Sequence, residues 1–105
     1  MKSVTKYLLV LIFFSACVSQ NNIKKFGQHY QKNKDYQNLK KVVDLIPLGA
    51  DSSEVKNILG DPIDMGFDFR YLLDSNGPNG CKVGAVFHLN EKGKIDQKWI
   101  DEICE

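Results

Sequence analysis

Residues 81–104, CKVGAVFHLNEKGKIDQKWIDEIC, decide the fold that the sequence predicts. Every second residue from Cys81 to Leu89 falls on one face, and those that follow the cysteine on this face are apolar. Such alternation is typical of a half-buried β-strand. The Asn-Glu-Lys-Gly that follows predicts a hairpin turn with Gly93 in the left-handed conformation. Residues 94–103 then predict a second strand, so the whole stretch predicts an antiparallel hairpin.

The turn also predicts how the two strands of this hairpin pair. With Asn90 opposite Lys94, the pairs on one face are Leu89–Ile95, Ala85–Trp99 and Cys81–Ile103. Side chains alternate between faces along a regular ladder, so all of these residues share the face that is buried. This register places Trp99 in the core together with Phe69 and Phe87. It also turns Cys104 away from Cys81.

A third strand is predicted ahead of the hairpin. In GFDFRYLLDS, residues 66–75, the aromatic and leucine side chains of Phe67, Phe69, Tyr71 and Leu73 fall on one face. The polar residues 75–80, SNGPNG, contain several turn signals and are expected to form an exposed loop. The three strands together predict an antiparallel sheet.

Two short helices are predicted before the sheet. Residues 36–45 have apolar side chains at helical spacing after a possible N-cap at Asp35, and Pro47 forces an end. The next stretch, GADSSEVKNILGDP over 49–62, predicts a capped helix that Gly60 and Pro62 stop. We therefore expect an α+β domain over 35–105, with two short helices packed on a three-stranded antiparallel sheet.

The beginning of the chain has the plan of a signal peptide, which we assign to residues 1–16. Two lysines precede an apolar run of roughly ten residues, whereas a membrane-spanning helix needs about 20. The run ends in Phe14-Ser15-Ala16-Cys17, which resembles a bacterial lipobox, although leucine is usual where this chain has Phe14. We expect Cys17 to carry the lipid anchor, with palmitate as one of its acyl chains. A plain secreted protein and an uncleaved anchor are the alternatives.

Residues 17–34 are predicted to be a polar segment that connects the lipid to the domain. Ile23, Phe26 and Tyr30 have helical spacing, but Gly27 argues against a helix there.

The remaining cysteines, Cys81 and Cys104, are predicted to form a disulfide because small exported domains often need one. The predicted register opposes this pairing, so it requires a bulge or a frayed end of the ladder. Two free thiols or half of a metal site are the alternatives. No Cys-x-x-Cys pair is present and only His88 lies between the two cysteines, so no metal site is predicted.

Several motifs resemble the SmpA/OmlA (BamE-like) family of small outer-membrane lipoproteins. They are Leu48-Gly49, Ser52 to Val55, Leu59-Gly60-Asp61-Pro62, Arg70-Tyr71, Phe87 to Leu89 and Gly93 to Ile95. The resemblance covers roughly residues 46–97 and does not include the cysteine pair or the first segment. It implies a non-catalytic binding or scaffold module, in outer-membrane protein assembly or envelope integrity, at the outer membrane and facing the periplasm. The β-lactamase-inhibitor repeats resemble the same layout, which keeps a periplasmic inhibitor of a secreted hydrolase or toxin as the alternative.

The outward face of the predicted sheet is the candidate partner surface. Its members are Arg70, Leu72, Val86, His88 and Ile100, with Lys98 beside them. Apolar side chains at such positions indicate either a protein partner or coverage by the first segment. For the inhibitor alternative, the loop over 75–80 would be the inserting element.

The other classes of function find no support in the sequence. The net charge of +1 gives no field that would attract nucleic acid. The two histidines, His29 and His88, show no arrangement with a nucleophile, so we predict no catalytic residue, cofactor, metal or small-molecule substrate.

Overall fold

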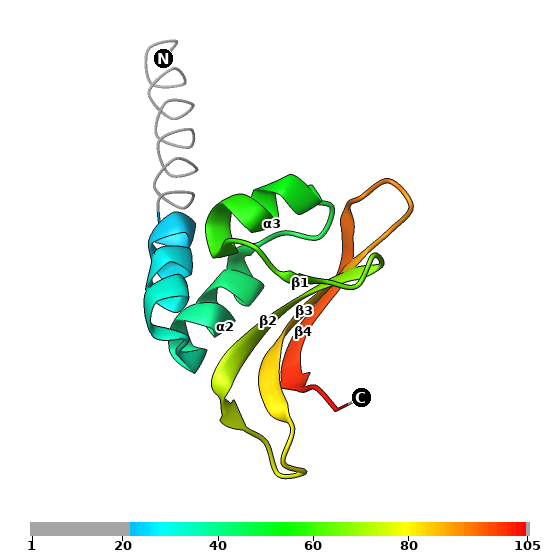
Figure 1. Ribbon diagram of the computed structural model, residues 1–105. Coiled ribbons are helices and arrows are strands. Elements are labelled where there is room, and N and C mark those ends of the chain that lie inside the picture. The colour runs from blue at the N-terminus through cyan, green and yellow to red at the C-terminus, as the bar shows by residue number, and fades with distance from the viewer. Residues whose placement is uncertain (1–21, 105) are drawn as a thin grey trace, which may run out of the picture.

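The computed structural model describes residues 22–104 and shows an α+β fold (Figure 1). In this part of the chain a helical segment over residues 22–33 is followed by two helices and a four-stranded antiparallel sheet in the order β1-β2-β3-β4. The elements are α2 (Tyr36–Leu45), α3 (Ser52–Leu59), β1 (Ile63–Asp64), β2 (Asp68–Asn76), β3 (Lys82–Leu89) and β4 (Ile95–Glu102). The predicted α+β class is confirmed. The strand count is one higher than predicted because β1, with two residues, is too short to show an alternating pattern.

The helical elements gather on one face of the sheet, where the core lies (Figure 1). The ring of Tyr71 on β2 contacts Tyr30 and Phe87 edge to face, at centroid distances of 6.2 and 6.0 Å. Phe87 and Leu39 are fully buried. The core therefore joins the helices to the middle strands of the sheet.

Residues 22–33, within the predicted polar segment over 17–34, are helical, so the argument from Gly27 against a helix there is wrong. Gly27 does not interrupt this helix but lets it approach α3, because a Cβ at Gly27 would lie 2.0 Å from the carbonyl oxygen of Ile58. Ile23 and Phe26 pack against the core, and Tyr30 is buried in it. The segment thus covers the helical side of the sheet, so the expectation that these three side chains cover the outward face is also wrong.

Both predicted helices are confirmed, with the expected local signals. Asp35 caps α2, since its carboxylate accepts from the backbone N–H of Asn38 at 3.1 Å. At the end of α3, Gly60 has a φ of 85° and its N–H donates to Lys56.

The β3–β4 hairpin departs from the predicted register by one residue. Leu89 pairs with Ile95 as predicted, but His88 pairs with Gln97, so Asp96 is an extra residue that forms a β-bulge. The turn alone could not reveal this bulge, in which the Asp96 carboxylate lies 2.7 Å from Nδ1 of His88.

The bulge reverses the faces of the residues that follow it in β4. Ala85 pairs with Ile100 rather than Trp99, and Trp99 pairs with Val86 on the outward face. The predicted core position of Trp99 is therefore wrong, and its side chain is 42% exposed. The outward positions predicted for Lys98 and Ile100 are wrong as well, because Lys98 reaches α2 and Ile100 packs against the core.

The same bulge brings the two cysteines together. Val83 pairs with Glu102, and two residues further along each strand lie Cys81 and Cys104. Their Cα atoms are 5.3 Å apart and their Sγ atoms are 2.00 Å apart. The predicted disulfide is thus present, and the conflict with the predicted register disappears.

Candidate protein-binding surface

One row of side chains crosses all four strands on the face away from the helices. Strand pairing aligns Ile63 with Arg70, Arg70 with Val86, and Val86 with Trp99. We call Ile63, Arg70, Val86 and Trp99 the outer row. Its two ends are exposed, Ile63 by 48% and Trp99 by 42%, whereas Val86 between its neighbours is only 3% exposed. The outer row therefore offers apolar side chains at both ends of a packed strip.

Acidic side chains hold the polar members of this face in place. The Nε of Arg70 lies 3.3 Å from the side chain of Asp68, which is buried. His88 is held by Asp96 at the bulge. Leu72 pairs with Gly84 in the neighbouring row and lies over it, since a Cβ on Gly84 would be 3.0 Å from a methyl carbon of Leu72. These contacts hold the side chains of this face in a fixed arrangement.

The structure thus keeps four of the five predicted surface residues on one face, Arg70, Leu72, Val86 and His88. It removes Ile100 and adds two residues that the sequence did not indicate. Ile63 was missed because β1 is so short, and Trp99 because the bulge reverses its direction. Trp99 carried one usable signal, since an assumed bulge between the turn and Cys104 would have both paired the cysteines and turned Trp99 outward.

An open hollow with a volume of about 440 Å³ lies beside the outer row. The side chains of Ile63, Met65, Leu72 and Ile103 line it, together with Arg70, Cys81 and Lys82. It is a mainly apolar depression, and it extends the surface towards the disulfide.

The loop between β2 and β3 is held by a single carboxylate. Glu102 accepts hydrogen bonds from the backbone N–H of Asn79 at 2.9 Å and of Cys81 at 2.8 Å, and from Nδ2 of Asn79 at 3.0 Å. Gly77 leaves room for that carboxylate, because a Cβ there would lie 2.5 Å from its Cδ. The tip of the loop, residues 78–80, remains exposed. The loop is therefore both exposed and fixed in shape.

Two buried tyrosine hydroxyls and the Asp51 carboxylate make contacts within the fold. Burial, with a contribution from Asp74, raises the pKa of Tyr30 to about 12, and its hydroxyl donates to the Leu72 carbonyl at 2.6 Å. Burial likewise raises the pKa of Tyr71, whose hydroxyl donates to the Gly60 carbonyl at 2.8 Å. The backbone N–H of Ser53 and the Lys94 ammonium lower the pKa of Asp51.

The donor atoms of Cys81, Glu102 and Cys104 lie within 4.8 Å of one another, a spacing that could suit a metal ion. The two sulfurs are bonded to each other, however, and a disulfide offers no thiolate ligand. The Glu102 carboxylate is also occupied by the loop. In the oxidised protein this cluster therefore has a structural role.

The remaining predicted site lies outside the described residues, since Cys17 precedes residue 22. Within residues 22–104, no helix combines the length and the apolar character that crossing a membrane requires. No protein-family model, curated protein or solved structure matches the chain. The family resemblance stated above therefore stays a prediction from its motifs.

Proposed function

We propose that this protein is a non-catalytic binding lipoprotein of the bacterial cell envelope. Cys17 would carry the lipid, and the outer row with its adjoining hollow would bind a protein partner. The observation that supports this best is that the helices of the described chain cover one face of the sheet and leave apolar side chains exposed on the other.

The composition of this surface fits a protein rather than a small ligand. Tryptophan and arginine are enriched among the residues that contribute most to protein–protein binding, and the outer row contains Arg70 and Trp99. Exposed apolar groups that lie together on a sheet commonly mark an interaction site. The contacts of Arg70 and His88 with carboxylates reduce the ordering cost when a partner binds.

The position of the lipid would keep the domain near the membrane. Asn22, the first described residue, is five positions after Cys17 in the sequence. Even a fully extended chain of that length spans at most about 18 Å. A partner at the inner surface of the outer membrane suits this geometry, and a scaffold role in outer-membrane protein assembly or envelope integrity is what the family resemblance implies.

Capture of partners from an envelope extract tests the proposal. The variant Ile63→Lys places a charge at one end of the outer row, and Tyr36→Lys makes the same change on α2, where Tyr36 is 47% exposed. We expect Ile63→Lys to lose the captured partner and Tyr36→Lys to retain it, with both variants melting near the unchanged protein. Equal capture by the two variants would contradict a role for the outer row.

A periplasmic inhibitor of a secreted hydrolase or toxin is the second candidate, and the fixed loop favours it. An exposed loop that is already ordered binds a cleft at a lower entropic cost. The variant Pro78→Ala changes only the exposed tip and leaves the bonds to Glu102 in place. Capture of a single soluble enzyme that is lost in Pro78→Ala but kept in Ile63→Lys would support the inhibitor.

A further inference from the structure

The outer side of β4 is an open sheet edge, because β4 is last in the strand order. At its beginning the edge is covered: the Ile95 N–H donates to Ala50 at 2.9 Å, and the Ile95 carbonyl accepts from Gly49 at 2.7 Å. Beyond the bulge, odd-numbered residues of β4 bond to β3, as Ile103 does with Lys82 at 2.8 Å. The backbone groups of Lys98 and Ile100 therefore point outward, and within residues 22–104 they have no hydrogen-bond partner.

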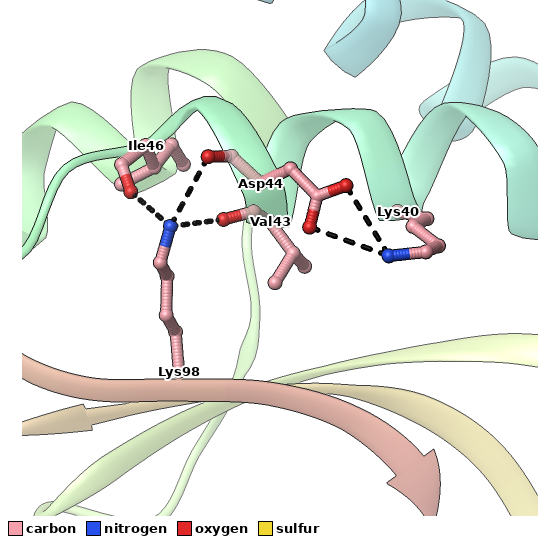
Figure 2. Close-up of polar contacts among 5 residues, drawn as sticks. All are labelled: Lys40, Val43, Asp44, Ile46 and Lys98. Atoms are coloured by element: carbon pink, nitrogen blue, oxygen red, sulfur yellow. Dashed lines mark hydrogen bonds and ion pairs between the residues drawn. The ribbon is translucent and has the colours of Figure 1, made fainter.

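Charged side chains usually protect such an edge from pairing with another chain. β4 contains suitable charges, but each is engaged within the molecule. Asp96 contacts His88 at 2.7 Å, and Glu102 accepts from the loop amides. Nζ of Lys98 turns to the end of α2 and donates to carbonyl oxygens there (Figure 2). Asp101 stays exposed next to the edge, and its carboxylate accepts from the backbone N–H of Glu102 at 2.7 Å. The part of the edge that is left without a charge beside its backbone is therefore the stretch from Lys98 to Ile100.

Exposed apolar side chains flank this edge on both sides of the sheet. Trp99 lies on the outward face and is 42% exposed. Leu45 and Leu48 lie on the helical side and are 43% and 59% exposed. Their position beside β4 follows from Lys98, which binds the Ile46 carbonyl between them, and from Gly49, which binds Ile95.

We infer that this edge pairs with the same edge of a second copy of the chain, antiparallel, with Trp99 at the two-fold axis. In this register the outward backbone N–H and carbonyl groups of Lys98 pair with those of Ile100 of the partner subunit. By symmetry, those of Ile100 pair with Lys98 of the partner subunit. The two Trp99 side chains face each other, and aromatic pairs across strands are favourable.

The side chains select this register among the possible ones. With the axis at Trp99, the Gln97 amide can donate to the carboxylate of Asp101 of the partner subunit. An axis at Ile100 would place Trp99 opposite Asp101 of the partner subunit, and an axis at Lys98 would place it opposite Gln97. Only the axis at Trp99 buries both indole rings together, which is why a second copy fits this edge.

Self-association of this kind would join two sheets into one, with the helices of both copies on the same side. The outer rows of the two copies would then form a continuous strip centred on the Trp99 pair. This inference does not depend on the identity or existence of the partner proposed above.

Cysteine cross-linking tests the register directly, in the full chain with Cys17→Ser. A mixture of Gln97→Cys and Asp101→Cys proteins keeps Trp99 and should form an intersubunit disulfide under mild oxidation. Each of these variants alone should form no intersubunit disulfide, because the same residue in the two subunits would be about 13 Å apart along the strands. Trp99→Cys alone should cross-link. Mass spectrometry should show the Cys81–Cys104 disulfide intact in every sample.

Sedimentation velocity supplies the second measurement. The Cys17→Ser protein should sediment as a dimer, and Trp99→Lys should weaken the dimer by at least about tenfold. Ile63→Lys, at the far end of the outer row, should not. A monomer at the highest soluble concentration would overturn the inference. Equal cross-linking of the mixture and of the single variants would overturn it as well, since that indicates random collisions.

Discussion

The Nζ atom of Lys98 lies 2.7 Å from the carbonyl oxygen of Ile46 and so joins β4 to the end of α2 (Figure 2). The same ammonium donates to Val43 at 2.5 Å and to Asp44 at 3.3 Å. These carbonyls lack partners within the helix, and a cation near them also interacts favourably with the helix dipole. The bulge at Asp96 makes this contact possible because it turns Lys98 towards the helices.

Replacing Lys98 with methionine keeps the aliphatic stem and removes these bonds. We expect Lys98→Met to lower the free energy of unfolding by about 2 kcal/mol, since hydrogen bonds from a charged group contribute at this level. Denaturant unfolding measures the change. Lys40→Met is the matched control, because its exposed contact with Asp44 at 3.2 Å should contribute under about 0.5 kcal/mol. Equal losses in the two variants would refute the role of Lys98.

The disulfide should make a separate contribution to stability. It closes a loop with a sequence separation of 23. The double variant Cys81→Ser, Cys104→Ser should therefore be less stable by about 3 kcal/mol in the chain-entropy model. Comparison of its unfolding with that of the oxidised protein measures this. Two thiols that react in the denatured, unreduced domain would show that the bond is absent.

Tyr30 predicts a loss of stability at high pH. Its pKa rises from the ordinary value of 10.0 to about 12 in the folded protein, so the folded state favours the protonated hydroxyl. The resulting stabilisation is complete below pH 10 and declines as the pH rises towards 12. Tyr30→Phe should be about 1 kcal/mol less stable at neutral pH because the bond to Leu72 is lost. Its unfolding free energy should also fall less between these pH values, and an identical decline in both proteins would be inconsistent with this assignment.

The lipid prediction can be tested without the folded domain. Cys17→Ala should abolish incorporation of labelled palmitate in a bacterial host and leave the precursor uncleaved. Cys104→Ala should still incorporate the label. Persistent labelling of Cys17→Ala would show that the lipobox interpretation is wrong.

The elements that the sequence predicted well are those that local signals define. Asp35 and Gly60 mark helix ends through contacts within a few residues, and the apolar residues at every second position indicated β3. The bulge at Asp96 was not predictable in the same way, because it involves His88 across the strand and contacts of Ile95 with the chain before α3. Gly27 was misjudged for a similar reason: its effect comes from packing against α3 rather than from helix propensity.

The bulge also decides which residues of the candidate surface were predicted correctly. Arg70, Leu72, Val86 and His88 come before the bulge in the pairing order and were placed correctly on one face. Ile100 and Trp99 come after it, so a one-residue shift exchanged their faces. The cysteine pair contained part of the missing information, since a bulge was one of the two ways in which it could form.

The central claim is that the outer row binds a protein in the cell envelope, and site-specific photo-cross-linking in living cells tests it most directly. A photoreactive amino acid would replace Ile63 in the full chain, and the same amino acid at Tyr36 would serve as the control on α2. We predict one discrete cross-linked partner from position 63, which copurifies with the membrane, and none from position 36. The same products from both positions, or none from position 63 while position 78 yields a soluble enzyme, would contradict the claim.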